Sequence, residues 1–209
     1  MKIKRKTKNA WKYAALLAII LAAVLAGISL LANTEWSVPV SVERTGPAIS
    51  QEVLDYRPLV EKYAEEYGIS EYTNVLLGVM MQESSGRGND PMQSSESHCG
   101  ERGCIDDPEQ SIKQGVYYFS QTLADADGDL KLAIQAYNFG RGFIDYVEEQ
   151  SGSYTQEAAI NFSQEMFASV DNPEEYRCPR DGAEEIGACY GDIYYVDSVM
   201  AYKEVLLSD

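Results

Sequence analysis

The chain has 209 residues, enough for one compact domain with an appendage and ample to bury a core without a structural metal. It carries a formal net charge of −16, from 33 acidic and 17 basic residues, so nucleic acid is a poor partner for it. The charge is uneven, because residues 1–13 hold six basic side chains and no acid, whereas all 33 acids lie beyond residue 34.

The N-terminal appendage is predicted to be a membrane anchor. Residues 1–13 form a basic tail, and residues 14–32 read AALLAIILAAVLAGISLLA without a charge, which at about 1.5 Å per residue is close to the roughly 30 Å of a bilayer core. The positive-inside rule keeps the tail in the cytoplasm and sends the rest of the chain outside. A cleaved signal peptide is the alternative, although its apolar region usually has only about 7 to 15 residues. Residues 33–49, with Pro39, Gly46 and Pro47, are predicted to be a spacer.

Residues 50–209 are predicted to form one domain that is almost entirely helical. Apolar residues recur at helical spacing in successive segments, and strict alternation over five or more residues is absent. Helices are expected at residues 58–67, 72–83, 108–124, 130–138, 143–150, 157–170 and 193–206. A polar loop at residues 84–107 is expected to join the second helix to the third. Such helices bury apolar stripes against one another, so we predict an all-α bundle with a surface groove.

The helix expected at residues 72–83 ends with a glutamate on its apolar face. Its buried stripe is expected to be Leu76, Val79 and Met80, and Glu83 follows these residues at helical spacing. Burial disfavours the ionised form of a glutamate, and raising its pKa from about 4.3 toward 6 or 7 would suit a general acid near neutral pH. The alternatives are that Glu83 caps the helix end in water or pairs with a buried arginine.

The cysteines agree with export, because four of them lie beyond the apolar segment and their number is even. Three pairings are possible, and the close spacings favour the local one, Cys99 with Cys104 and Cys178 with Cys189. Zinc binding is the alternative, but the spacings do not match and His98 is the only histidine. We therefore expect two disulfides, with no metal and no cofactor.

Four sequence blocks resemble, in order, those of a known family. They are MMQESSGRG at 80–88, NDPMQSSES at 89–97, SIKQGVYYF at 111–119 and AIQAYNFGRGFIDYV at 133–147. The blocks are similar to the lysozyme-like domain of Gram-positive cell-wall hydrolases, as in the muramidase half of two-domain autolysins and in pneumococcal vaccine antigen A. The likeness runs from about Tyr56 to Tyr202, and a more distant one links the chain to goose-type lysozymes and soluble lytic transglycosylases.

The resemblance implies a lysozyme-like helical bundle with a surface glycan cleft. It also implies that Glu83 is the catalytic acid, that Asp90 assists it, and that the substrate is bound by Ser84, Gln93, Ser95, Tyr137 and Asn138. Two of these residues have simpler interpretations, because Tyr137 continues an apolar stripe and Asn138 could merely end its helix.

The function implied is cleavage of the β-1,4 bond between N-acetylmuramic acid and N-acetylglucosamine in peptidoglycan, by a membrane-anchored domain at the cell wall. The expected partners are therefore peptidoglycan and the membrane, without nucleic acid. The second carboxylate would act as a nucleophile at about 5 to 5.5 Å from the acid or activate water at roughly 6.5 to 9.5 Å, and the sequence does not choose between them. The alternatives are a lytic transglycosylase that leaves 1,6-anhydro ends and a catalytically weak peptidoglycan-binding surface protein.

Overall fold

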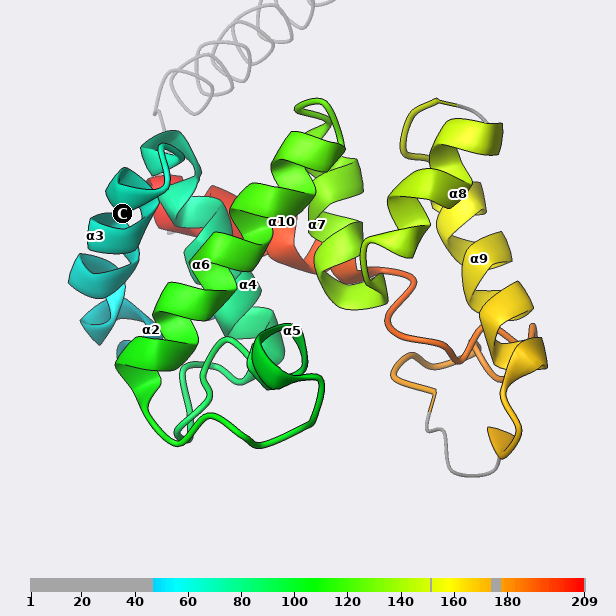
Figure 1. The fold of residues 1–209 in the computed structure, drawn as a ribbon, viewed down its shortest axis with the longest axis horizontal. Coiled ribbons are helices and arrows are strands. Elements are labelled where there is room, and N and C mark those ends of the chain that lie inside the picture. Colours follow the sequence, from blue (N-terminus) through cyan, green and yellow to red (C-terminus); the bar gives the residue numbers. More distant parts are fainter. Residues whose placement is uncertain (1–46, 151, 174–177, 209) are drawn as a thin grey trace, which may run out of the picture. The chain divides into compact units, whose positions relative to one another are not determined.

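The computed structural model describes residues 47–150, 152–173 and 178–208 of the chain (Figure 1). The chain divides into two units, Met1–Arg44 and Thr45–Asp209, and all described residues belong to the second. The predicted basic tail, membrane segment and most of the spacer thus lie outside the described residues. Within the described ranges, no helix is both long and apolar enough to cross a membrane.

The described part of the chain consists of helices and loops, without a strand. This confirms the all-α prediction. Three short helices were not predicted, namely Gln51–Asp55 before the first expected helix, Ser70–Tyr72 at the start of the second, and Ser95–Cys99 within the expected polar loop. In chain order the elements are α2 (Gln51–Asp55), α3 (Arg57–Glu66), the 3₁₀ helix η1 (Ser70–Tyr72), α4 (Thr73–Glu83), α5 (Ser95–Cys99), α6 (Pro108–Asp125), α7 (Leu130–Phe139), α8 (Gly142–Gln150), α9 (Gln156–Ser169) and α10 (Tyr195–Ser208).

Local chemistry sets where several of these helices begin. The side chains of Ser50, Asp107, Asp129 and Thr155 accept hydrogen bonds from backbone N–H groups in the first turns of α2, α6, α7 and α9. Each of these N–H groups has no partner within its own helix, so a side-chain cap typically stabilises the helix by about 1 kcal/mol. Pro108 at the start of α6 adds a backbone angle already suited to a helix.

Helix α4 forms the centre of the domain, with α10, α3 and α2 packed against it. Its residues Val75, Leu76, Leu77, Val79 and Met80 are each at most 2% exposed, so the helix is buried on all sides. The predicted buried residues Leu76, Val79 and Met80 are confirmed, but the burial is not confined to their face. Their neighbours Val75 and Leu77 are apolar and buried too.

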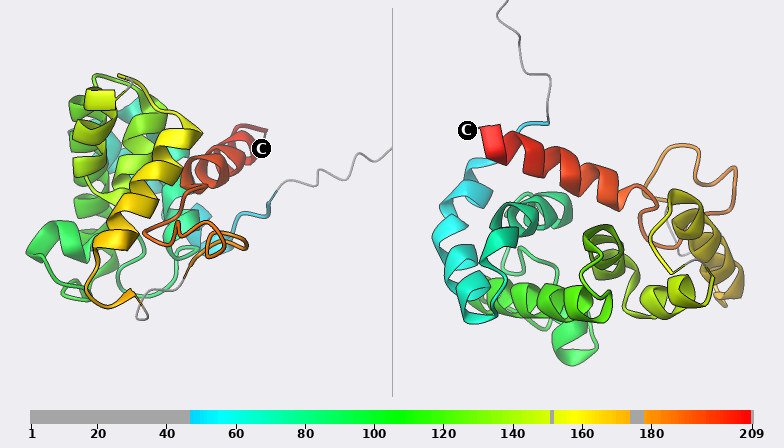
Figure 2. Two further views of the ribbon diagram at one scale, coloured as in Figure 1. Left: turned by 90° about the vertical axis from the view of Figure 1, so that its right-hand side faces the viewer. Right: turned by 90° about the horizontal axis from the view of Figure 1, so that it is seen from above.

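Close contact between α4 and α10 depends on a glycine. A methyl group at Gly78 would lie 2.8 Å from the backbone oxygen of Val199 on α10, which is closer than real side chains come. Figure 2 shows α10, the last helix of the chain, running past the inner helices of the domain. The glycine thus lets the end of the chain lie directly against the helix that carries Glu83.

Helices α8 and α9 lie together at the end of the domain away from α2 and α3 (Figures 1 and 2). Their aromatic side chains form a cluster in which Phe143 lies 5.2 Å from Phe139 and 5.1 Å from Phe162, measured between ring centroids. Tyr190 joins the cluster, 6.1 Å from the ring of Phe162. The cluster thereby holds the segment before α10 against α7 and α9.

Candidate active site

Glu83 is the last residue of α4, and its carboxyl group accepts a hydrogen bond of 2.6 Å from the hydroxyl of Tyr195 at the start of α10. Tyr195 is only 1% exposed, so this contact lies against the core. Burial raises the pKa of Glu83 to about 7, helped by the negative charges of Asp90 and Asp192 and opposed by the Tyr195 hydrogen bond. Neither simpler interpretation holds, since no arginine pairs with Glu83 in the described residues and its side chain is partly buried.

Asp90 lies in the loop after α4 and accepts five hydrogen bonds. Its Oδ1 accepts from the backbone N–H of Ser94 at 2.9 Å and from the hydroxyls of Ser111 at 2.6 Å and Ser94 at 3.3 Å. Its Oδ2 accepts from the N–H of Ser95 at 3.1 Å and from its hydroxyl at 2.6 Å. Burial by itself would raise the pKa of Asp90, but these hydrogen bonds lower it below the ordinary value.

The two carboxyl groups therefore differ in charge near neutral pH. Glu83 is mostly protonated at a pH below about 7, where Asp90, with its lowered pKa, is already ionised. Environments that push two carboxyl pKa values apart in this way assign one group as an acid and leave the other as a fixed negative charge. Such a pair can protonate a leaving oxygen and stabilise positive charge that develops next to it.

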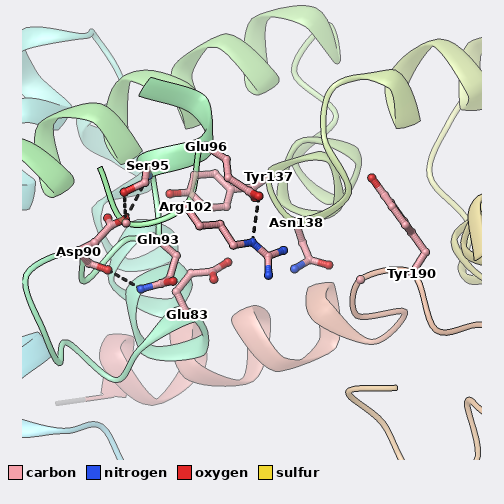
Figure 3. A pocket seen from close by; sticks show the side chains of 11 residues that line it. Glu83, Asp90, Gln93, Ser95, Glu96, Arg102, Tyr137, Asn138 and Tyr190 are labelled. Atoms are coloured by element: carbon pink, nitrogen blue, oxygen red, sulfur yellow. Dashed lines mark hydrogen bonds and ion pairs between the residues drawn. The ribbon is translucent and has the colours of Figure 1, made fainter. Parts of the chain in front are cut away.

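Both carboxyl groups line a cleft of about 500 Å³ (Figure 3). A second cavity of about 260 Å³ shares five of its residues, so the two form one groove along α7. The first cavity is lined by Glu83, Asp90, Gln93, Ser95, Glu96, Arg102, Gly103, Tyr137, Asn138, Tyr190 and Gly191. The groove is open and lined mainly by polar residues, which suits a polar chain more than a small apolar ligand.

Six of the seven residues predicted to form the site line this cleft. Gln93 is exposed there with a left-handed backbone, φ +48°, an uncommon conformation that presents its side chain beside Asp90. Tyr137 is 8% exposed and donates to the backbone oxygen of Met92 at 2.9 Å, so it belongs both to the core and to the cleft wall. Ser95 also lines the cleft, although its hydroxyl is engaged by Asp90 and by the N–H of Ile105.

Ser84, predicted to bind the substrate, is not among the residues that line the cleft. Its hydroxyl donates to the backbone oxygen of Pro91 at 2.7 Å and accepts from the N–H of Arg87 at 3.1 Å. These contacts tie the end of α4 to the loop that carries Asp90. The structure therefore gives Ser84 a positioning role instead of a place in the cleft.

Asn138 lines the cleft and also holds the segment before α10. Its side-chain oxygen accepts from the backbone N–H of Asp192 at 2.7 Å, and α7 continues past it to Phe139, so it does not simply end the helix. Asp192 is 5% exposed and is bound by both Nε and Nη2 of Arg180 at 2.7 Å and by the amide of Gln82 at 3.2 Å. This network fixes the chain that carries Tyr190 and Tyr195.

Sequence reasoning missed Tyr195, Tyr190 and Arg102 in this site. Nothing local marks Tyr195 as the partner of Glu83, because the two residues are 112 positions apart. Arg102 had a visible signal, since it lies in the hexapeptide CGERGC between two cysteines that the spacing already paired.

Both predicted disulfides, Cys99 with Cys104 and Cys178 with Cys189, are present in the structure. In the part of the chain that the structure describes, no group of three or more histidine, cysteine, aspartate or glutamate residues could hold a metal ion.

An all-helical domain whose open groove carries one protonatable and one ionised carboxyl group has the features of a glycoside-cleaving enzyme. The sequence agrees with this class, because residues 50–203 match the model of the lysozyme-like family. The chain belongs to that family.

Several known proteins are similar to this chain. It is 42% identical over 159 residues to the uncharacterized membrane protein YocA of Bacillus subtilis (strain 168), covering 74% of this chain and 70% of YocA. It is also 42% identical over 155 residues to the bifunctional muramidase/DL-endopeptidase CwlT of the same strain, covering 74% of this chain and 42% of CwlT. A crystal structure described as similar to a lipoprotein of the NLP/P60 family, from Staphylococcus aureus subsp. aureus Mu50, is 41% identical with a TM-score of 0.65. That match covers 75% of this chain and 54% of the other.

Proposed function

We propose that this protein cleaves the glycan strands of peptidoglycan at the β-1,4 bond between N-acetylmuramic acid and N-acetylglucosamine. One observation carries the proposal, namely that a glutamic acid with a pKa of about 7 lies in an open polar groove beside an ionised aspartate. Glu83 donates its proton to the glycosidic oxygen as the bond breaks. The name muramidase, carried by the relative CwlT, supports the same substrate and bond.

In this proposal Asp90 acts through its charge. Both carboxylate oxygens of Asp90 accept hydrogen bonds from Ser94, Ser95 and Ser111. These bonds hold the oxygen atoms in place and make them poor nucleophiles. A fixed negative charge beside the reacting sugar stabilises the oxocarbenium ion that forms as the leaving group departs. Water then attacks the sugar, and the ionised Glu83 is the base that can accept its proton.

The test is digestion of purified peptidoglycan by the wild type and by Glu83→Gln. The amide keeps the shape of the side chain but cannot donate an acidic proton, so the rate should fall by about 10² to 10⁴-fold with the fold intact. Glu148→Gln is a matched control, because Glu148 is exposed on α8 outside the cleft and its loss should leave the rate unchanged. Near wild-type digestion by Glu83→Gln would rule out this residue as the acid. A wild type that binds walls without lowering their turbidity would instead indicate a binding protein.

A lytic transglycosylase is the second candidate, and the hydrogen bonding of Asp90 is compatible with it. Both oxygens of Asp90 already accept hydrogen bonds, which leaves Glu83 as the proton-transferring carboxyl group of the pair, and a transglycosylase needs only one such glutamate because the 6-hydroxyl of the muramoyl residue takes the place of water. Mass spectrometry of the reduced products separates the two reactions. Anhydro ends lie about 20 Da below the reduced hydrolytic ends, given the chemistry of ring closure.

We also propose that residues 14–32 anchor the protein in the cell membrane, with the tail in the cytoplasm and the domain at the cell wall. The uncharged apolar run and its basic flank support this placement, and the relative YocA is named a membrane protein. Protease added to intact wall-less cells should degrade the domain and leave only the tail. A mature secreted form that begins near Asn33 as the main species would refute the anchor.

A further inference from the structure

The hexapeptide CGERGC, residues 99–104, forms a turn that the Cys99–Cys104 disulfide closes; we call it the disulfide turn. Gly100 and Gly103 have φ values of +80° and +75°, which residues with a side chain rarely adopt. The two glycines permit the tight turn around Glu101 and Arg102, and the covalent link between the cysteines closes it. The turn therefore holds the backbone of Arg102 at a definite place.

That place is the edge of the catalytic cleft. Arg102 is the only lysine or arginine among the described residues that line the two cavities of the groove. Figure 3 shows its guanidinium group pointing into the cleft that also holds Glu83 and Asn138. The cleft otherwise presents the negative charges of Asp90 and Glu96, so Arg102 supplies its positive charge.

Arg102 contributes little to the stability of the fold. Its Nε donates to the carboxylate of Glu96 at 2.9 Å, but the side chains are 89% and 62% exposed, and ion pairs so exposed contribute little stability. The disulfide already closes the turn without it. Among the described residues, the terminal nitrogens of the guanidinium group make no hydrogen bond, so they can bind a ligand in the cleft.

We propose that Arg102 binds a carboxylate carried by the muramoyl residue of the glycan, an inference that rests on the proposed function. The planar fork of a guanidinium group matches the two oxygens of a carboxylate. A muramoyl residue bears a lactyl group that ends in a carboxylate when the stem peptide is absent. When the peptide is present, the lactyl carboxyl is an amide and the nearest carboxylates belong to the peptide. Arg102 thereby distinguishes muramoyl strands from neutral glycans and offsets repulsion by Asp90 and Glu96.

The test measures binding of labelled, soluble glycan strands to the full chain that carries Glu83→Gln, so that strands remain uncut whether or not the protein is an enzyme. Four ligands are compared, namely strands with and without stem peptides, each with its carboxylates free or converted to amides. Arg102→Gln should weaken binding of strands with free carboxylates by about three- to tenfold, the range between an exposed ion pair and a charge-assisted hydrogen bond. Arg102→Lys should keep part of the affinity, since it keeps the charge without the fork.

The matched control is Arg87→Gln, which removes the same charge from an exposed residue outside the cleft and should not change binding. An effect limited to peptide-bearing strands identifies a peptide carboxylate, and an effect limited to peptide-free strands identifies the lactyl carboxylate. An unchanged affinity of Arg102→Gln, or equal weakening for amidated strands, would overturn the inference. Cleavage of the same strands by the wild type is measured separately. If the proposed function is wrong, the wild type leaves the strands intact, whatever the binding measurements show.

Discussion

Replacement of Tyr195 by phenylalanine tests how the site controls the proton on Glu83. The change removes the hydroxyl that donates to Glu83 at 2.6 Å while keeping the buried ring. This hydrogen bond favours the ionised carboxylate, so its loss should raise the pKa of Glu83 above its present value of about 7. A hydrogen bond to a charged group contributes about 1.5 to 3 kcal/mol, and one pKa unit corresponds to about 1.36 kcal/mol. Because Glu83 is partly accessible to water, we expect the lower end, a rise of about one unit.

The assay is the pH dependence of peptidoglycan digestion. A general acid works only when protonated, so activity falls as the pH rises through its pKa, and the alkaline limb of the profile should move up by about one unit in Tyr195→Phe. The maximal rate should fall by no more than about tenfold, because the acid itself remains. Tyr194→Phe is the control, since Tyr194 is 40% exposed and does not bond Glu83 through its hydroxyl. An alkaline limb that stays in place or moves down would refute this reasoning.

Three further substitutions follow from the structure. Asp90→Asn should lower the free energy of unfolding at pH 7 by about 1 to 3 kcal/mol, because an amide cannot accept all five hydrogen bonds. The pKa of Asp90 is lowered in the folded state, so the ionised carboxylate stabilises the wild type above a pH of about 4, and this stabilisation is lost as the pH falls further. Denaturant titrations should therefore show that the difference in the free energy of unfolding between the wild type and Asp90→Asn becomes smaller below that pH. Gly115→Ala should lower the melting temperature and the activity, since the new methyl group would lie 2.8 Å from the hydroxyl of Tyr137, whereas Gly142→Ala, with open space around it, should be neutral or stabilising. Cys104→Ser should reduce activity while the domain stays folded at the assay temperature, because a disulfide that closes so short a loop stabilises the fold by at most about 2 kcal/mol. Unfolding of the variant at the assay temperature, or full activity of the folded variant, would contradict this.

The sequence was sufficient where local chemistry determines the structure. Pro108 with Asp107 before it marks the start of α6, and Asp129 marks the start of α7, because a proline or a side-chain cap acts within one turn. The local disulfide pairing was predictable for the same reason, since short separations keep the cysteines near each other. The raised pKa predicted for Glu83 agrees with the buried surroundings of its carboxyl group, although the helix that carries it is buried on all sides and not on one face.

The parts that escaped prediction depend on contacts between distant segments. Helix α5 begins among serines in a polar loop, and the carboxylate of Asp90 binds the N–H groups of Ser94 and Ser95 at its start. The ion pair of Arg180 with Asp192 and the bond from Tyr195 to Glu83 join segments that no local pattern relates. Burial of a polar group predicts that it has a partner, but only the fold identifies which one.

The distance along the chain between Glu83 and Tyr195 also determines when the site can come into being. A polypeptide is made from its N-terminus, so α4 and its glutamate emerge long before the tyrosine that orients the carboxyl group and the residues, Tyr190 and Gly191, that complete the cleft wall. An unfinished chain therefore lacks an assembled acid. If the domain cuts wall polymer, a chain that stops before Tyr195 has neither the hydroxyl that binds the carboxyl group of Glu83 nor the residues that complete the cleft around the strand.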